Sequence, residues 1–584
     1  MKNFIKSLYL FTLYILLSAS SDNSENKEFL SFLDNEWKYR LSQSPVYATA
    51  MGIKGYETEW RDNSLEAIQS RVAHMENALK KLKSFNAENL SESNQLNLRL
   101  FFQLTAINLE ISNYNRHLLP FSHRGGVQLA HEDAEVIPLK SFDDFSFWIQ
   151  RLKKLDKRIN QTITLAEIGI EKGYKPPRVL MDRVYRQIAL QSQSNVSNSP
   201  FYKIFIDLPD SISNEDQIIL RREAKKVIKE TVIPSYVLLE KFFNKEYLRQ
   251  SRDTVGLYDI PDGRKFYEVL AKSFTTTKLS PKEIHQMGLD EVRRIRGEME
   301  TVIKELEFEG SFKDFLTFLR EDERFYYKTS EELFEGYLAV SKRIDPELVK
   351  LFGNLPRTPY GLRAIPEESA PDTTTAYYMS PSPDGLRPGY YYVNLYKPET
   401  RPKFEMEVLS VHEAVPGHHL QISLAMEMEE MPMFRRVSPY TAFVEGWGLY
   451  SESLGYDLGL YKDPYSKFGQ LTYDMWRAVR LVVDTGMHYF EWDRQKAIDF
   501  FLDNAGKSKL DIVNEIDRYI VMPGQALAYK IGQMKFLSLK EKARTEIGKN
   551  FDIRGFHDVI LSHGALPLNE LDSIIEAYIQ EHIE

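Results

Sequence analysis

Cysteine is absent from all 584 residues of the chain. Its absence excludes disulfide bonds, and it excludes the thioether through which lipoproteins carry their lipid. An excess of basic charge is also absent, since 75 Lys and Arg residues face 84 Asp and Glu residues, for a formal net charge of -9. A nucleic-acid-binding surface needs concentrated positive charge. We therefore expect no nucleic-acid partner.

The apolar run near the N-terminus is short. It extends from Leu8 to Leu17, follows Lys2 and Lys6, and leads into the small residues of "LSAS". This order is typical of a secretory signal peptide, and the run is too short for a membrane span. We predict that residues 1–20 are a signal peptide and that the mature chain is exported, periplasmic or extracellular, without a membrane span. "LSAS" resembles a lipobox with serine in place of the lipidated cysteine, so we expect no lipidation; the alternative to a signal peptide is a buried or interfacial helix.

Helical periodicity dominates the rest of the chain. Apolar residues recur at three- and four-residue intervals, for example in the segments that begin at Ser64 and Ser141. This spacing is typical of amphipathic helices that pack against a core. We predict a mainly α protein with one large domain over residues 21–584, divided into an N-terminal half at about 28–350 and a motif-bearing half at about 351–584. The sequence carries no signature of an oligomeric state.

A proline-rich stretch over residues 356–402 interrupts the helical pattern. Within it, "GYYYVNLY" at residues 389–396 is an aromatic and β-branched run between Gly and Pro, which predicts a strand. The strand precedes a predicted helix that carries a His-Glu pair. An exposed strand edge can pair with a peptide backbone, so we predict that Tyr391 and Asn394 bind substrate. The alternative is a small sheet that only braces the helices.

Three of the twelve histidines gather in "SVHEAVPGHHLQ", at positions 412, 418 and 419, beside Glu413. In a regular α-helix, two residues bind one ion when they are four apart, which corresponds to roughly 40° and 6 Å. His418 would lie roughly 240° around the helix from His412, and His419 about 10 Å along the axis. Neither histidine meets a shared zinc ion in a regular helix.

Pro416 and Gly417 offer a solution to this spacing. Proline lacks the N–H of a helical residue, and glycine accepts unusual backbone angles. Together they can loop two residues out of the helix, which reduces the motif to a His-Glu-x-x-His frame. We predict His412 and His418 as metal ligands, with His419 directed to substrate. Which of the two adjacent histidines faces the metal stays open.

A catalytic zinc site needs a third protein ligand and one open position. "YTAFVEGWGLYSESLG" offers Glu445 and Glu452 on a second helix. We predict Glu445 as the ligand of one Zn²⁺ ion per chain, since such a glutamate a few dozen residues after the second histidine is the usual design of one large zinc-peptidase group. Glu452 could hold a ligating histidine by its free nitrogen. The alternative for either glutamate is a solvated helix face.

An open zinc site predicts roles for further residues. Glu413, next to the first ligand, is the candidate general base, because it can take a proton from water and deliver it to the leaving amine. The segment "DRYIVMPGQALAYKIG" presents Tyr519 and Tyr529 as candidate catalytic donors to an oxyanion, and Gln525 as a substrate-binding residue. The alternative for all three is ordinary packing.

A helix in "WRAVRLVVDTGMHYFEW" carries Arg477, Arg480, Asp484 and His488. Asp484 and His488 are four residues apart, so the carboxylate could orient the imidazole. We list His488 and Arg477 as substrate-binding residues, the arginine for a substrate carboxylate. A salt-bridged helix face is the alternative for the arginines.

The motifs have a family resemblance. In order along the chain they are "HEAVPGHHLQ", "EGWGLYSE", "VVDTGMH" and "PGQALAYKIG". Together with "FLDNEWKYRLSQSPVYATAMG" and "GYKPPRVLMDRV", they resemble the bacterial family known only as domain of unknown function number eight-eight-five. The resemblance covers most of the chain and implies an exported protein or lipoprotein.

A more remote resemblance concerns Gly417 and His418. This pair is similar to the Gly-His ending of the zinc motif in angiotensin-converting enzyme, thimet oligopeptidase and carboxypeptidase Taq. Dipeptidyl-peptidase III is a further parallel, because its motif also contains an insertion. The resemblance implies a helical body with a deep active-site cleft, a small sheet beside the zinc helix, zinc on His412, His418 and Glu445, and Glu413 as base. The two-residue insertion departs from all of these families.

Our leading hypothesis from the sequence is an exported zinc metallopeptidase that hydrolyses short peptides. One alternative is a zinc amidase or deacylase acting on a non-peptide amide. Another is a non-catalytic peptide-binding protein on a decayed peptidase fold. The presence of all four residues of the candidate site argues against decay.

Overall fold

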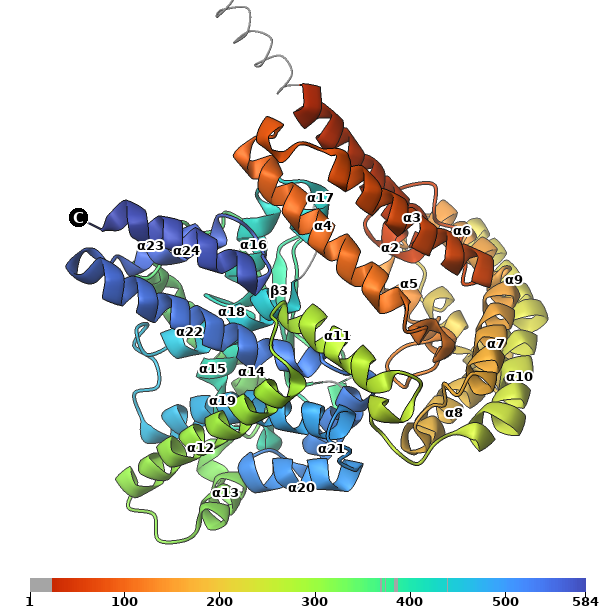
Figure 1. Ribbon diagram of the computed structural model, residues 1–584. Helices are drawn as coiled ribbons and strands as arrows, with labels where there is room; N and C mark the ends of the chain where they lie inside the picture. The colour runs from red at the N-terminus through yellow and green to blue at the C-terminus, as the bar shows by residue number, and fades with distance from the viewer. Residues whose placement is uncertain (1–23, 368–369, 373, 383–386, 438–439, 584) are drawn as a thin grey trace, which may run out of the picture. The chain divides into compact units, whose positions relative to one another are not determined.

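The computed structural model describes residues 24–367, 370–372, 374–382, 387–437 and 440–583. The predicted signal peptide, residues 1–20, lies outside the described residues. Helices dominate the described residues, whose named strands form one three-stranded sheet (Figure 1). The predicted mainly α class with a small β-sheet is therefore confirmed. The deep cleft stays a prediction.

Contacts within the chain divide it into two compact units. Unit 1 comprises the residues up to Val255, with Asp259–Gly263 and Pro432–Phe434. Unit 2 comprises Gly256–Tyr258, Arg264–Met431 and Arg435–Glu584. The division that we predicted at about residue 350 lies inside unit 2. All candidate site residues belong to unit 2.

Unit 1 is helical. Its elements are a helix over residues 24–42, α2 (Pro45–Ala50), α3 (Leu65–Ser84), α4 (Glu92–Ser112), α5 (Asp133–Val136), α6 (Phe142–Leu152), α7 (Leu155–Glu171), α8 (Arg178–Ser192), α9 (Asn214–Val227) and α10 (Ile233–Phe242). Serine caps begin several of these helices, and Ser141 forms a capping box with Asp144 at the start of α6. The buried guanidinium of Arg151 donates to Thr49 Oγ1 and to the carbonyl of Tyr56, both at 2.8 Å, and so ties α6 to α2 and the turn after it.

Unit 2 carries the sheet and the remaining helices. They are α11 (Gly263–Thr275), α12 (Pro281–Glu305), α13 (Phe312–Glu321), α14 (Ser330–Ile344), β1 (Tyr360–Ala364), β2 (Ala376–Met379), β3 (Gly389–Val393), α15 (Met406–Glu413), α16 (His418–Met426), α17 (Met433–Val437), α18 (Thr441–Leu454), α19 (Pro464–His488), α20 (Arg494–Asn504), α21 (Lys509–Val521), α22 (Ala528–Ile547), α23 (Ile553–Leu561) and α24 (Leu568–His582). Helix α11 begins with Gly263 of unit 1, and the short helix α17 has residues in both units.

Helix α19 is the central element of unit 2. Nearly every residue from Phe468 to His488 is buried, because α12, α20, α21 and α22 all pack against this helix (Figure 1). A helix that is apolar on one face only is normally half exposed. The polar residues of α19 therefore need hydrogen-bond partners inside the protein, and several of these partners lie around the candidate site.

The three strands form a sheet in the order β1-β3-β2, with β1 parallel and β2 antiparallel to β3. The central strand β3 alternates between buried and half-buried residues, as expected of a strand with one face on a core. Both β2 and α14 contact α15. The strand predicted within residues 389–396 is confirmed for Gly389–Val393, and it lies in the sheet that borders the His-Glu helix.

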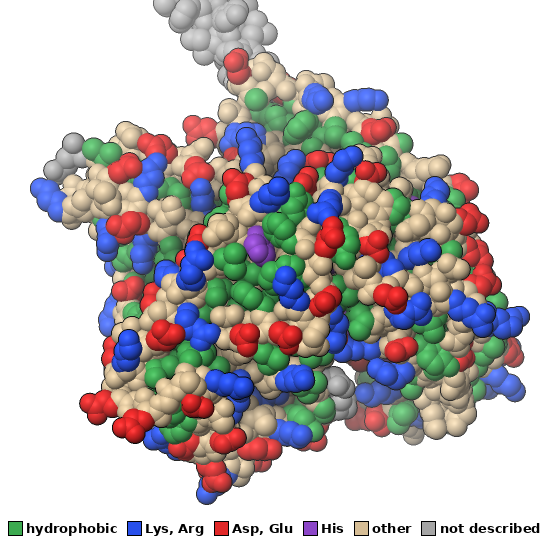
Figure 2. Space-filling view, turned by 60° about the horizontal axis from the view of Figure 1, so that its bottom comes forward, with side chains coloured by type: hydrophobic (Ala, Val, Ile, Leu, Met, Phe, Trp, Pro, Cys, Tyr) green, Lys and Arg blue, Asp and Glu red, His purple; other side chains and the backbone are tan. Residues whose placement is uncertain are grey.

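None of the described helices combines the length and the apolar character that a membrane crossing needs. Figure 2 shows one face of the molecule, on which Lys and Arg side chains are interspersed with Asp and Glu side chains. This face is therefore a surface of mixed charge.

Candidate metal centre

The helix that begins with Met406 is interrupted directly after Glu413. The N–H of Gly417 donates to the carbonyl of Val411 at 2.9 Å, six residues back. A regular α-helix bonds to the residue four back, so two extra residues are accommodated at this point. The Val415–Pro416 peptide bond is cis. The helix then resumes as α16, whose first residue is His418. The looped insertion predicted from Pro416 and Gly417 is present.

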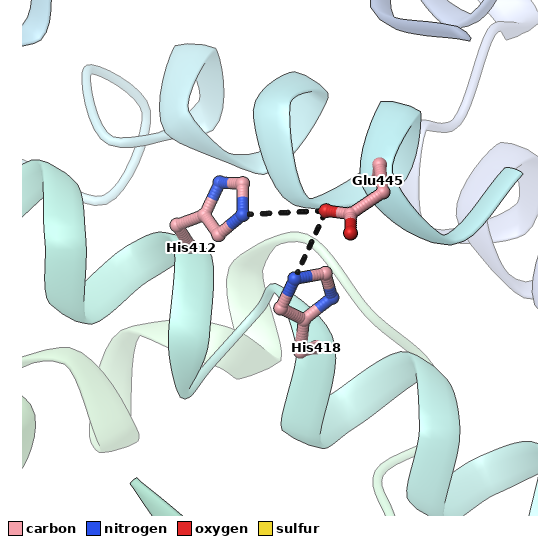
Figure 3. A group of neighbouring side chains, drawn as sticks. All are labelled: His412, His418 and Glu445. Carbon is pink, nitrogen blue, oxygen red and sulfur yellow. Dashed lines mark ion pairs between the residues drawn. The ribbon is translucent and has the colours of Figure 1, made fainter. Parts of the chain in front are cut away.

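The interruption brings three potential ligands together (Figure 3). His412 at the end of α15, His418 at the start of α16 and Glu445 on α18 have ligand atoms within 4.8 Å of one another. The Nε2 atoms of His412 and His418 lie 3.9 Å and 3.5 Å from Oε2 of Glu445. The two imidazole rings are nearly perpendicular, with centroids 4.7 Å apart. Both histidines are buried, whereas the Glu445 side chain is 22% exposed.

The far side of the His412 ring is fixed. Its Nδ1 forms a hydrogen bond of 2.8 Å with Oε1 of Glu452, in which Nδ1–H donates when Glu452 is ionised, and Glu452 also lies 3.5 Å from Arg477. A proton on Nδ1 leaves the lone pair of Nε2 free for a metal. Gly448, one turn before Glu452, leaves room for the ring: a Cβ at Gly448 would lie 2.9 Å from Cε1 of His412. The role predicted for Glu452, holding His412 by its free nitrogen, matches this geometry.

Two glycines set the distance between α18 and α22. A Cβ at Gly446 would lie 2.5 Å from the Cα of Gly532, and one at Gly532 would lie 2.0 Å from the carbonyl oxygen of Ala442. The helix backbones therefore touch at this crossing, because any larger residue would separate them. Glu445 is adjacent to the crossing on α18, and Tyr529 is one turn from it on α22.

The three residues fit a zinc ion. In a tetrahedral site, two atoms that each lie about 2.1 Å from zinc are about 3.4 Å apart. The separations of 3.5 Å and 3.9 Å between the imidazole nitrogens and Glu445 are close to this value. Two neutral imidazoles with one carboxylate are a common ligand set of catalytic zinc sites. His412, His418 and Glu445 are the residues that would hold the metal.

The pKa values of the three groups follow from burial and from their mutual contacts. Burial, followed by the charges of His418 and Arg477, lowers the pKa of His412 well below its ordinary value. Burial opposes the charged form of His418, but the hydrogen bond and charge of Glu445 outweigh it and raise the pKa of His418. Burial likewise opposes ionisation of Glu445, yet its contacts with His418 and Tyr529 lower its pKa.

Glu413 lies beside the three ligands and next to the sheet. Burial raises the pKa of Glu413, while the backbone N–H of Tyr378 in β2, as a hydrogen-bond partner, acts in the opposite direction. The contact connects the carboxyl group to the edge strand of the sheet. Glu413 is thus buried beside the candidate ligands, and its role as a base stays a prediction.

His419 is directed away from the ligand group. Its Nε2–H donates to the carbonyl of Thr358 at 3.1 Å, which leaves Nδ1 as an acceptor, and the hydroxyls of Tyr378 and Ser423 lie 2.9 Å and 3.2 Å from Nδ1. Burial lowers the pKa of His419 to about 4. The structure therefore brings His418, and not His419, to the candidate metal position, and both nitrogens of His419 are engaged with the sheet region.

The two residues predicted to bind substrate from the strand are both buried. Tyr391 is fully buried in β3, and its ring packs edge-on against Tyr337 with centroids 5.9 Å apart. Asn394 follows the strand; its Nδ2 donates to the carbonyl of Ala370 at 2.8 Å, and its Oδ1 accepts from the N–H of Tyr396 at 3.0 Å. These contacts anchor the sheet and the loop before it.

The predicted pairing of Asp484 with His488 takes another form. The Nδ1 of His488 accepts from the N–H of Leu257 at 3.1 Å, and its Nε2–H donates to the carbonyl of Tyr519 at 3.0 Å. Oδ1 of Asp484 accepts from the Tyr267 hydroxyl at 2.5 Å and from the N–H of Gly524 at 3.0 Å. Both side chains therefore hold backbone segments in place.

The three residues predicted around the second Pro-Gly pair belong to one network. Tyr529 is a hydrogen-bond partner of Glu445, and Gln525 is one of Tyr529. The hydroxyl of Tyr519 donates to Glu515 at 2.6 Å, so it is not directed at the ligands. The sequence analysis missed Glu515 and Arg518, which hold this network together; as charged residues on an ordinary amphipathic helix they gave no signal.

A family match covers most of the chain. The family described as "Bacterial protein of unknown function (DUF885)" matches residues 45–575, and the chain belongs to this family. The family resemblance predicted from the motifs is confirmed. The more remote resemblance to zinc peptidases stays a prediction. No curated protein matches the chain.

Solved structures share the fold. The crystal structure of a candidate lipoprotein from Colwellia psychrerythraea is similar over 95% of this chain and 100% of that chain, with 29% identity and a TM-score of 0.89. A candidate lipoprotein of unknown function from Shewanella oneidensis is similar over 94% of this chain and 99% of that chain, with 18% identity and a TM-score of 0.72. At the lower identity, the likeness is one of fold.

Proposed function

We propose that the protein is an exported zinc metallopeptidase that hydrolyses short peptides. The observation that carries the proposal is the convergence of His412 Nε2, His418 Nε2 and one Glu445 oxygen within 4.8 Å. Glu413 directly follows His412 in the sequence, and its carboxyl group interacts with the charges of His418 and Glu445. The two extra residues between His412 and His418, which depart from the usual four-residue spacing, are compatible with this convergence.

Zinc, when bound, supplies Lewis acidity and lowers the pKa of a water molecule to about 7. The residues of the chain perform the remaining steps. Glu413 accepts a proton from the attacking water and donates it to the leaving nitrogen. Glu452 keeps the proton of His412 on Nδ1, because Oε1 accepts from that atom at 2.8 Å. The hydroxyl of Tyr529, beside Glu445, is the donor available for the oxyanion that forms at the scissile carbonyl.

The test is metal analysis combined with peptide digestion. Purified protein should contain about one zinc per chain, and a mixed peptide library read by mass spectrometry should show cleavage that a chelator abolishes. His418→Ala should lose the zinc. Glu413→Gln should keep the zinc and lose cleavage. His419→Gln, the matched control at the adjacent histidine, should retain zinc.

Other outcomes distinguish the alternatives. Metal-free protein that still binds peptides would contradict the proposal and indicate a binding protein. Zinc-containing protein that leaves all peptides intact but releases an amine from a non-peptide amide would indicate an amidase or deacylase.

Export is part of the proposal. The order of charges and apolar residues in 1–20 supports a cleaved signal peptide, and both solved structures named above are described as candidate lipoproteins. A thioether-linked lipid requires cysteine, which this chain does not contain, so we expect export without that anchor. N-terminal sequencing of the protein recovered from fractionated cells tests both points.

A further inference from the structure

A buried carboxylate with two guanidinium partners lies behind the candidate metal centre. Oε2 of Glu515 on α21 accepts from Arg480 and Arg518, both at 3.0 Å, and from the Tyr519 hydroxyl at 2.6 Å. Burial would raise the pKa of Glu515, but the charges of Arg518 and Arg480 outweigh burial and lower it to about 2. Glu515 therefore stays ionised and fixes both arginines by charge-assisted hydrogen bonds.

A chain of contacts leads from this cluster to the candidate ligand Glu445. Nη1 of Arg518 donates to Oε1 of Gln525 at 2.8 Å. Gln525 is in turn a hydrogen-bond partner of Tyr529, and Tyr529 is one of Glu445. All of these residues belong to unit 2. The guanidinium of Arg480 also lies 4.3 Å from the centre of the Tyr529 ring, which fixes the ring from a second side.

The direction of the hydrogen bonds is determined by chemistry. A guanidinium only donates, so the group that Gln525 turns to Arg518 is its carbonyl oxygen. The NH₂ end of the same amide is then left for Tyr529, and it also only donates. The Tyr529 oxygen accepts from Gln525, and its own hydrogen points elsewhere, toward Glu445.

We propose that Arg518 and Gln525 are positioning residues that orient the Tyr529 hydroxyl, so that its hydrogen is available at the metal centre. The inference rests on the proposed zinc-peptidase function. It adds two residues that touch neither substrate nor metal, and it reassigns Gln525 from substrate binding to orientation. It also gives a role to the buried ion cluster around Glu515, which Gln525 connects to Tyr529.

The substitution Gln525→Glu tests the direction of the relay. It preserves the shape of the side chain and its bond to Arg518, but replaces a donor by an acceptor, so the Tyr529 hydrogen turns to residue 525. We expect kcat to fall at least about tenfold, toward the 10²–10³ that loss of an oxyanion donor costs. KM should change by less than about threefold, and activity is measured with zinc in excess, because the Tyr529 hydrogen also contacts the candidate ligand Glu445.

A double-mutant cycle separates orientation from general damage. If Gln525 acts through Tyr529, then Tyr529→Phe with Gln525→Glu should be no slower than Tyr529→Phe alone. Gln470→Glu is the matched control, because Gln470 is a buried glutamine whose Oε1 accepts from another tyrosine, Tyr456. It should leave kcat unchanged. If Gln525→Glu proves unstable in thermal unfolding, Arg518→Lys serves instead, since it keeps the charge opposite Glu515 and loses the fork that reaches Gln525.

The outcomes are distinguishable. A wild-type protein that cleaves peptides while Gln525→Glu retains kcat within twofold overturns the relay alone, as does an additive cycle. A wild-type protein without zinc overturns the proposed function and the relay with it. A loss of kcat that is coupled in the double-mutant cycle, with KM preserved at saturating zinc, supports the relay.

Discussion

Two Pro-Gly pairs interrupt helices in unit 2, and they do so for different reasons. Gly417 has an ordinary φ of -73°, but a Cβ there would lie 1.9 Å from the carbonyl oxygen of His412. Gly524 has a left-handed φ of +83°, and the nearest atom to its Cβ position is 3.3 Å away. The first pair needs glycine for space, and the second needs glycine for its backbone angle.

The acceptor of the glycine N–H decides what each pair does. The N–H of Gly417 returns to the preceding helix at Val411, so α16 stays tied to α15 and His418 is delivered to a fixed place. The N–H of Gly524 is bound by Asp484 on another helix, so α21 ends and a new helix starts in its own direction. Identical dipeptides thus produce a bulge in one place and a stop in the other. The variants below test this contrast, in order of their expected effect on zinc affinity.

Gly417→Ala should have the largest effect. Its methyl group would overlap the carbonyl of His412, so the two helices must separate and the ligands with them. We expect zinc affinity to fall more than about 100-fold and the free energy of unfolding to fall by about 3 kcal/mol. Chelator competition and urea unfolding measure the two quantities. Retention of wild-type zinc affinity would contradict the role of Gly417 in placing His418.

Gly448→Ala should reduce zinc affinity by about tenfold, because it displaces the His412 side chain and leaves the backbone in place. The added methyl would lie 2.9 Å from the His412 ring, which must turn away from Glu452, while the bulge is unaffected. The same chelator competition applies. Thermal unfolding of the metal-free protein should change less than for Gly417→Ala, and an equal change would mean that Gly448 serves the fold more than the ring.

Gly524→Ala should leave zinc affinity within about threefold of wild type and cost about 1–2 kcal/mol of unfolding free energy. The cost comes from the left-handed backbone, so Gly524→Asn should be milder, because asparagine tolerates this conformation. At Gly417, asparagine should be no better than alanine. If asparagine rescued both positions equally, the contrast between the two pairs would be wrong.

Asp484→Asn should have the smallest effect on zinc affinity and a distinct effect on pH dependence. Burial raises the pKa of Asp484 to about 7, above its value in the unfolded chain. The folded protein therefore holds this proton more tightly, and its stability falls as pH rises from about 4 to 7, by up to about 1.4 kcal/mol per pH unit. Asparagine can still accept from Gly524 and carries no such cost. Urea unfolding at several pH values should show that the free energy of unfolding of the variant rises relative to that of the wild type as pH rises. Parallel dependences on pH would contradict the raised pKa of Asp484.

The local part of the site could be predicted from the sequence. The spacing of His412, Pro416, Gly417 and His418 predicts a looped helix, because proline and glycine have well-defined backbone effects. The strand at residues 389–393 followed from its aromatic residues and its Pro-Gly borders. These features depend on neighbours in the chain, which a single sequence displays.

The distant partners could not be predicted. Residues 484 and 488 are correctly placed on one helix face by their spacing, but Tyr267 and Leu257 bind them from more than 200 residues away. A spacing of four residues on a helix allows two side chains to contact each other. It does not exclude that each forms its hydrogen bonds with another segment instead. In the same way, Glu515 gathers two arginines only once α19 and α21 have packed together.

The glycine crossing of α18 and α22 has a consequence for engineering. The distance between Glu445 and Tyr529 depends on the direct contact between the helix backbones at Gly446 and Gly532, where no side chain separates the helices. Directed evolution can therefore vary the side chains around the candidate metal centre while this spacing is retained. The same contact is intolerant of single substitutions, since a larger residue at either glycine has no smaller partner to compensate for it.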